Sequence, residues 1–481
     1  MSRRALGVLG LAAGLFGCTV GPDYTPPEMA LPGRFVEAAS GGQAAVAADW
    51  WHQLGDAELD ALVAQALDGG PDMAAAAARV REARAERAFV AARDDPSVEA
   101  GISAARQHGS GSVPVGTPPG GMGHDVGSNL WLAGFDAGWE IDIFGGTRRA
   151  VESADASLGA AIETAHDVES MLAAEVARDY VTLRGAQRRL AIAHETLEER
   201  RDIRKLVAAQ FQSGLVGALD LRRAEAELAD SEAEIPALEA EVRADIYKLG
   251  VLVGRPPEAL EDRLALPAPI PVARVAMTPG LPSDLLQRRP DVRAAERRIA
   301  AANARIGVAE ADLYPHFSLT GAAGLESLDA GSWFDPRSRY YAIGPSIRWL
   351  VFDSGRVRDQ MLAERARTDA AAADYRKTVL GALAEVETAL VSYGRQQIRR
   401  DALGREVAAD RDALSLAERL YGQGLQDFLA VLDAERALHL AEEAESDAER
   451  DTSLAFIALC KALGGGWQPG DAAGAAQTDR S

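Results

Sequence analysis

Histidine and cysteine, the residues most often found at catalytic and metal sites, are few in this sequence of 481 residues, and their spacing indicates no active site. The seven histidines are scattered, without the spacing typical of metal ligands, and the HExxH, GxSxG, P-loop and Rossmann glycine patterns are absent. Of the two cysteines, Cys18 lies in a targeting segment and Cys460 stands alone, so no intrachain disulfide is expected. Cys460 is either a reactive thiol or, as we expect, a small buried residue near a helix end. The sequence therefore predicts no enzyme, metal site or cofactor.

The first 17 residues have the pattern of a signal peptide, two arginines followed by an apolar run too short to remain as a membrane helix. This run ends in Leu15-Phe16-Gly17-Cys18, which resembles the cleavage box of bacterial lipoproteins. We therefore expect a lipid on Cys18; the alternative is ordinary signal cleavage beside an incidental cysteine. Thr19 follows the cysteine where an aspartate would retain the product, so the resemblance implies sorting to the outer membrane.

Composition favours long, closely packed helices over a thick globular core. The chain is 47% hydrophobic but only 6% aromatic, and alanine, glutamate and arginine dominate long stretches of it. The formal net charge of −21 argues against a nucleic-acid partner, because phosphate binding needs clustered basic side chains.

Two short segments, 211–225 and 421–435, have the pattern of tight turns between helices and share five equivalent positions at a constant offset of 210. These pairs are Phe211 and Tyr421, Gly214 and Gly424, Leu215 and Leu425, Leu219 and Leu429, and Glu225 and Glu435. A shared offset over five positions indicates an internal duplication. The glycines are expected to adopt a left-handed backbone in the turns.

Four segments alternate apolar and polar residues with a period of two, which predicts strands. They are 97–107, 129–144, 316–326 and 340–352. A glycine- and proline-rich loop, 108–128, joins the first two. Aromatic residues on the apolar faces favour two membrane β-hairpins over a soluble sheet with one wet face. The acidic side chains of the second strand, Asp136, Glu140 and Asp142, would face a lumen or simply solvent.

Helical patterns fill most of the remaining chain. The expected helices are 56–93, 145–211, 217–252, 283–313 with Ser283 as N-cap, 353–421 and a last helix ending near 463. Heptad-like spacing of apolar residues in the long helix indicates helix-on-helix packing, and Pro236 should kink the returning helix. The first 67-residue helix would reach roughly 100 Å, which predicts an elongated body with strands at one end and turns at the other.

Four strands cannot close into a barrel, yet a bilayer tolerates no open sheet edge. Three copies would supply twelve strands, enough for a lumen, whereas two would supply eight, a width that side chains usually plug. We therefore expect a mainly α-helical fold in which a 12-stranded trimeric membrane β-barrel continues into a long α-helical barrel.

The chain resembles the TolC-like outer-membrane efflux proteins, most closely the lipoprotein members that serve RND-type pumps. The resemblance covers the mature chain and rests on several motifs. They are Cys18-Thr-Val-Gly-Pro-Asp-Tyr24, Leu286-Gln-Arg-Arg-Pro290-Asp291, Ala309-Glu-Ala-Asp-Leu-Tyr-Pro315, Val431-Leu-Asp433-Ala and Leu459-Cys-Lys-Ala-Leu-Gly-Gly-Gly-Trp467. It implies the exit duct of a tripartite pump that passes small toxic compounds outward. The implied partners are two further copies, a periplasmic adaptor (membrane fusion protein), an inner-membrane RND-type pump and outer-membrane lipid.

The resemblance also implies roles for residues of the turns. Leu429 and Asp433 match positions that ring a closed periplasmic aperture, where three aspartates would repel one another and favour cations. Tyr421 and Asp220 match a hydrogen-bonded pair that locks the aperture; Asp220 could instead be only a helix N-cap. The docking sites for adaptor hairpins match the two Gly-Leu turns, which are Gly214-Leu215 and Gly424-Leu425.

The expected organisation follows the repeats. Its parts are a signal peptide (1–17), a lipidated extended segment (18–55), helix one (56–96), barrel hairpin one (97–144), coiled-coil hairpin one (145–253), an equatorial connector (254–282), helix two (283–315), barrel hairpin two (316–352), coiled-coil hairpin two (353–463) and an equatorial segment with a disordered tail (464–481). Two other functions stay open at this point: an exit duct for secreted proteins, and a coiled-coil spacer of the periplasm without a pore.

Overall fold

The computed structural model describes residues 19–37, 47–107, 128–273 and 280–467. The expected signal peptide, Cys18, most of the loop at 108–128 and the expected tail at 470–481 lie outside these residues. The described residues form two compact units: one within Met1–Pro27, Arg81–Ala160 and Glu296–Asp374, the other within Glu28–Val80, Ala161–Ala295 and Tyr375–Ser481. Within the described part of the chain, no helix combines the length and apolar character needed to cross a membrane.

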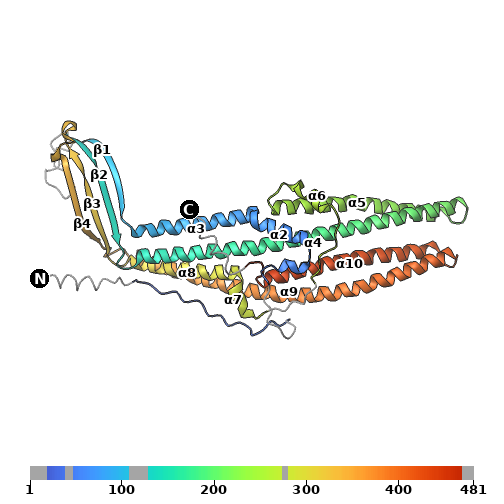
Figure 1. Cartoon of the computed structure of the whole chain (residues 1–481). Coiled ribbons are helices and arrows are strands. Elements are labelled where there is room, and N and C mark those ends of the chain that lie inside the picture. The colour runs from blue at the N-terminus through green and yellow to red at the C-terminus, as the bar shows by residue number, and fades with distance from the viewer. Residues whose placement is uncertain (1–18, 38–46, 108–127, 274–279, 468–481) are drawn as a thin grey trace. The chain divides into compact units, whose positions relative to one another are not determined.

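The first unit holds a single antiparallel sheet of four strands in the order β1-β2-β3-β4 (Figure 1). The strands are β1 (Ser97–Gln107), β2 (Ser128–Ile141), β3 (His316–Ser327) and β4 (Arg339–Arg348). All four were predicted from alternation, but the second and fourth were predicted to run three and four residues too far. Both strands pair with β3, which begins only at His316. Ile141 pairs with Phe317 and Arg348 with His316, so both ladders end there although the alternation continues.

The register places the alternating apolar residues of the four strands on one face. For example, Ile102 lies opposite Ala133, Phe135 opposite Ala323, and Phe317 opposite Ile347. Many of these side chains are uncovered: Ile102 is 80% exposed and Phe135 61%. An uncovered apolar face of this size is unusual for a sheet in water and typical of one that faces lipid.

The duplication predicted from the turns is confirmed by the helix lengths. Helices α4 (Gly146–Gln212) and α9 (Arg356–Gly422) both have 67 residues, and α5 (Ala218–Leu252) and α10 (Phe428–Ala462) both have 35. Corresponding ends differ by 210, the offset of the turn residues. Helix α5 continues through Pro236, and the predicted kink there stays a prediction.

The heptad positions of α4 form part of the second unit's core, as predicted. Leu172, Val176, Leu183 and Leu197 are all buried. Leu197 packs with Ala193 of the same helix and with Ile235 and Leu238 of α5. This contact joins the two helices of the first hairpin and explains why α5 runs back beside α4 (Figure 1).

The helix that precedes the strands in each repeat is broken, although one continuous helix was predicted. The first is split into α2 (Ala57–Gly69) and α3 (Pro71–Ala91), and the second into α7 (Leu285–Arg288) and α8 (Pro290–Ala311). A residue before proline is disfavoured in the helical region, and Gly70 and Arg289 are both extended, with ψ of 147° and 118°. The broken position recurs at an offset of 219, so it belongs to the duplication.

The start of the second of these helices also differs from prediction. Ser283 is not its N-cap: it lies inside a short 3-10 helix, Pro282–Asp284, that precedes α7. Asp284 instead accepts the backbone N–H of Leu281 at 2.9 Å. The expected connector at 254–282 is not wholly irregular, since it contains a 3-10 turn, Pro257–Leu260, and the short helix α6, Glu261–Leu264.

The extended segment that begins at Thr19 is held by polar contacts to the buried side chain of Arg149. The guanidinium of Arg149 donates to the carbonyls of Val20 and Gly21 at 3.0 and 3.1 Å and to Asp23 at 2.8 Å. Gly21 lies against Gly307 with a φ of 91°, where a side chain would meet the Gly307 backbone.

Candidate functional site at the helix turns

The two turns between the long helices have the same backbone geometry. Gly214 and Gly424 both have a φ of 74°, which confirms the predicted left-handed glycines. The following leucine donates its N–H to the carbonyl five residues back in each turn, Leu215 to Gln210 and Leu425 to Leu420, at 2.9 Å. These bonds close the end of the preceding helix in a Schellman-type arrangement.

The helices leaving the turns start differently in the two repeats. Asp427 caps α10, because its carboxylate accepts the N–H of Ala430 at 3.2 Å. The cap of α5 is Gly217, with no side-chain bond. Asp220 therefore lies in the first turn of α5 and is not its N-cap, so the alternative role considered for it is wrong.

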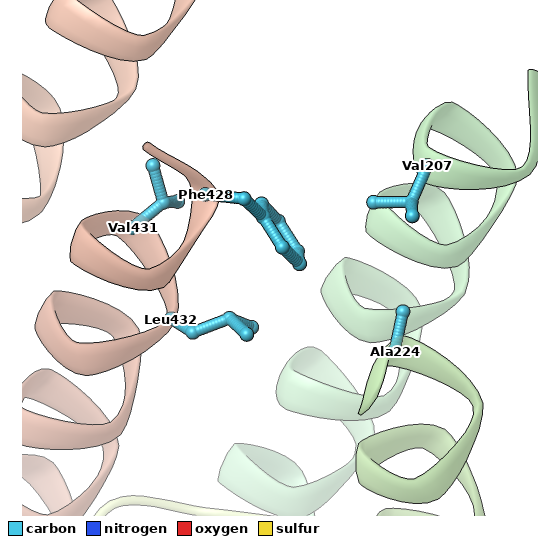
Figure 2. Close-up of a cluster of buried hydrophobic side chains, with 5 residues drawn as sticks. All are labelled: Val207, Ala224, Phe428, Val431 and Leu432. Atoms are coloured by element: carbon cyan, nitrogen blue, oxygen red, sulfur yellow. The ribbon is translucent and has the colours of Figure 1, made fainter. Parts of the chain in front are cut away.

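A buried apolar cluster joins the two hairpins next to the turns (Figure 2). It consists of Val207 from α4, Ala224 from α5, and Phe428, Val431 and Leu432 from α10. Phe428 and Leu432 point from α10 toward the first hairpin in Figure 2. Because the cluster draws on both repeats, it is an apolar contact that fixes the turns relative to one another within one chain.

Tyr421 makes a polar contact between the same two hairpins. Its hydroxyl donates to Oε1 of Gln210 at 2.6 Å, and its ring lies 5.7 Å from that of Phe428. The structure thus brings Tyr421 to Gln210 of α4 rather than to Asp220. Gln210 was missed in the sequence because it lies outside the duplicated turn segment.

The residues expected to line an aperture lie on the outer surface of the single chain. Leu429 is 45% exposed and Asp433 is also exposed, one helical turn further along α10. The two turn leucines project still further, with Leu215 76% and Leu425 69% exposed. Exposed apolar side chains at a turn favour a protein contact there.

A buried charge network that sequence reasoning missed also joins the two hairpins. Arg200 of α4 donates to Oγ of Ser231 at 2.7 Å and to the carbonyl of Glu227 at 3.0 Å, both on α5. Its Nε lies 3.9 Å from Oε1 of Glu435, which is buried. Arg436 pairs with Glu227 across the hairpins. The signal available in the sequence was the recurrence of glutamate at positions 225 and 435.

The environment of Glu435 disfavours its ionised form. Burial is the main cause that raises the pKa of Glu435 to about 7; the carboxylates of Glu199, Glu227 and Glu418 act in the same direction, and Arg200 opposes them. The folded chain therefore holds a proton on Glu435 more firmly than the unfolded chain does. Stability from this residue is greatest at low pH and falls as the pH rises from about 4.5 to about 7.

We expect Glu435→Gln to stabilise the protein at pH 8 and to change it little at pH 4, since the substitution removes a buried carboxylate that is charged only at the higher pH. The pKa shift corresponds to a gain of about 3 kcal/mol at most. Thermal unfolding of both proteins across this pH range measures it. Glu225→Gln is the matched control, because this glutamate holds the equivalent position but its side chain is 33% exposed. An equal gain at both pH values would contradict the assignment.

The structure describes one of the two cysteines, Cys460. Cys18, the expected lipid attachment site, lies outside the described residues. Cys460 is fully buried in α10, and burial raises the pKa of its thiol. This confirms it as a buried structural residue rather than a reactive thiol.

The chain is similar in sequence and fold to known outer-membrane proteins. The model of the outer membrane efflux protein family matches residues 62–255 and 281–465. The pyoverdine export outer membrane protein OpmQ of Pseudomonas putida is 35% identical over 472 residues, which cover 97% of this chain and 98% of OpmQ. The solved outer-membrane channel OprN has a TM-score of 0.85 and 39% identity over 94% of this chain and 100% of its own. The open state of the MtrE outer membrane channel of Neisseria gonorrhoeae has a TM-score of 0.80 and 28% identity, over 93% of this chain and 98% of its own.

Proposed function

Because the chain belongs to the outer membrane efflux protein family, we propose that it is the exit duct of a tripartite pump for small toxic compounds. The protein is an outer membrane efflux channel and not an enzyme. It shares the fold of solved outer-membrane channels, including OprN at 39% identity. The role as exit duct rests on one observation. A single chain combines an exposed apolar sheet face with two equivalent helical hairpins.

The working form is a trimer. Among the residues that the structure describes, β1 and β4 are each paired on one side only, so the sheet has two open edges. Edges in a bilayer must be paired, and pairing β4 of one copy with β1 of the next in a ring of three gives a closed barrel of twelve strands. The helices that follow the strands then form a periplasmic α-helical barrel around the same axis.

The segments of the chain take the roles expected for such a duct. The parts 97–144 and 316–352 are the barrel hairpins, and 145–253 and 353–463 are the coiled-coil hairpins. The segment 254–282 and the residues after 463 form the equatorial part. A lipid on Cys18 anchors the mature chain to the outer membrane, next to the segment that Arg149 holds in place.

The turns are the periplasmic end, where a membrane fusion protein of an RND-type pump docks. Leu215 and Leu425, each presented by a left-handed glycine, offer exposed apolar contacts of the same geometry. Two equivalent turns in each of three copies present a ring of like contacts, so each adaptor hairpin finds an equivalent site.

Leu429 and Asp433 form the gate of the closed state. Both are exposed in the single chain and lie on one face of α10. In the trimer, this face of each copy is directed at the common threefold axis. Leu429 narrows the opening by packing, and the carboxylates of Asp433 favour cations. That MtrE has been solved in an open state supports a channel of this kind that opens and closes.

Tyr421 and Asp220 are assigned to the lock of the gate, with Gln210 as the partner of Tyr421 within the chain. We expect Tyr421→Phe combined with Asp220→Ala to raise the conductance of the purified channel, because each subunit loses about 1 kcal/mol of hydrogen bonding. Gln210→Ala should act in the same direction as Tyr421→Phe. If conductance is unchanged in the double variant, in Tyr421→Phe alone and in Gln210→Ala, other residues hold the gate closed.

The proposal is tested by the conductance of the purified protein in a planar lipid bilayer. An outer-membrane duct produces discrete conductance steps that grow in the lock variants. A coiled-coil spacer without a pore leaves the bilayer insulating in every variant, and that result would overturn the proposal.

A further inference from the structure

Three potential metal ligands meet between the hairpins, away from the turns. Glu234 of α5 faces His439 and Glu443 of α10, and one ligand atom of each lies within 4.8 Å of the other two. The three side chains are half-buried, and His439 Nε2 lies 3.7 Å from Glu443 Oε1. His439 and Glu443 are four residues apart, so they project from the same face of the helix.

The imidazole of His439 is oriented as a metal ligand would be. Its Nδ1 lies 3.0 Å from Oγ1 of Thr196, a buried residue of α4. In the tautomer with the proton on Nδ1, the ring donates to Thr196 and leaves Nε2, which lies 3.7 Å from Glu443 Oε1, free to bind a metal. A hydrogen bond from the other ring nitrogen is the usual support of a ligating histidine.

The cluster combines two carboxylates with one imidazole, and the charge of Arg189 also reaches Glu443. Arg189 is already engaged, since it donates to both carboxylate oxygens of Glu241. Two carboxylates and one imidazole therefore offer a divalent cation oxygen and nitrogen ligands at one place.

The cluster is not a by-product of the duplication. At the offset of 210, the positions equivalent to His439 and Glu443 are Ala229 and Ala233. The sequence had predicted no metal site because its histidines are scattered; the spacing of four between His439 and Glu443 was the available signal, and the third ligand comes from a distant segment.

We propose that Glu234, His439 and Glu443 bind a divalent transition-metal ion, with Zn²⁺ as the fitting probe, and so link the first hairpin to the second. One imidazole nitrogen and two carboxylate oxygens suit Zn²⁺, with water in the fourth position. Ligand atoms around one Zn²⁺ lie at most about 4.4 Å apart, so small side-chain rotations complete the site. The ion would cross-link α5 to α10 and oppose separation of the hairpins.

The test is titration of the full-length, metal-stripped protein in detergent with Zn²⁺ by calorimetry, using a purification tag without histidine. We expect one Zn²⁺ per chain, with affinity at least tenfold weaker in His439→Gln and in Glu234→Gln. Thr196→Val should weaken binding about tenfold through the loss of ring orientation. Absence of stoichiometric binding by the unmodified protein would overturn the proposal.

The control is His194→Gln, which removes an exposed histidine of the same region of α4 and should leave Zn²⁺ binding unchanged. Thermal unfolding supplies a second measurement that also reports folding of each variant without metal. Zn²⁺ should raise the melting temperature of the unmodified protein and of His194→Gln, and leave that of His439→Gln unchanged. An equal rise in His439→Gln would likewise refute the site.

Discussion

Replacing Ile343 by arginine should sharply reduce the amount of folded protein in the outer membrane. Ile343 lies in the middle of β4, opposite Gly321, and its side chain is 74% exposed on the apolar face of the sheet. An arginine at the bilayer midplane of a membrane strand costs about 2 to 4 kcal/mol, and a trimer carries three of them. The measurement is the fraction of heat-modifiable protein in isolated outer membranes.

The matched control lies one residue earlier. Ala342 is in the same strand but on the opposite face, because successive side chains of a strand alternate. Ala342→Arg should assemble normally, since that face is toward the aqueous lumen in our account. Adding Ile102→Arg, on β1, should deepen the defect of Ile343→Arg. Equal assembly of the Ile343 and Ala342 variants would contradict the assignment of the lipid face.

Phe428→Ala should loosen the contact between the two hairpins at the turns more than any hydrogen-bond variant. Phe428 is buried and packs against Val207 of the other hairpin and the ring of Tyr421. Removing a buried phenylalanine costs about 3 to 5 kcal/mol, several times the cost of one hydrogen bond. Hydrogen exchange should accelerate in the first turns of α10 and the last turns of α4, and the channel should spend more time open.

Leu440→Ala is the control for this effect, since Leu440 lies on the same helix but is 64% exposed. It should change exchange and stability within about 0.5 kcal/mol. The duplication sharpens the comparison, because the first repeat has only Ala218 at the position of Phe428. The apolar contact is therefore asymmetric: α10 supplies the large side chains and the first hairpin receives them. Unchanged exchange in Phe428→Ala would show that the turns are held by other contacts.

Much of the fold was predictable because the sequence is internally duplicated, so each half indicates the same elements. The offset of 210 between Gly214 and Gly424 indicated the two long hairpins, and alternation indicated all four strands. The breaks at Gly70 and Arg289 were missed because the helical pattern continues across them, although each precedes a proline. The end of β4 at Arg348 depends on where the neighbouring strand β3 begins. Alternation within a single strand does not contain that information.

The candidate site was less predictable than the fold. The turn glycines follow from local backbone chemistry, and their geometry is confirmed. Gln210, Arg200 and Glu435 matter through contacts between helices that are distant in sequence. The expected partner of Tyr421 was taken from a family resemblance, whereas the single chain pairs it with Gln210. Residues that act only at a threefold axis, such as Asp433, stay predictions.

The most direct test of the central claim is the sensitivity of cells that lack this chain to a panel of small toxic compounds. Deletion should lower the inhibitory concentration of those compounds that the pump exports. The unmodified chain and Ala342→Arg should both restore resistance, and Ile343→Arg should not. Unchanged sensitivity to every compound tested, in a strain shown to express the chain before deletion, would contradict its role as an efflux duct.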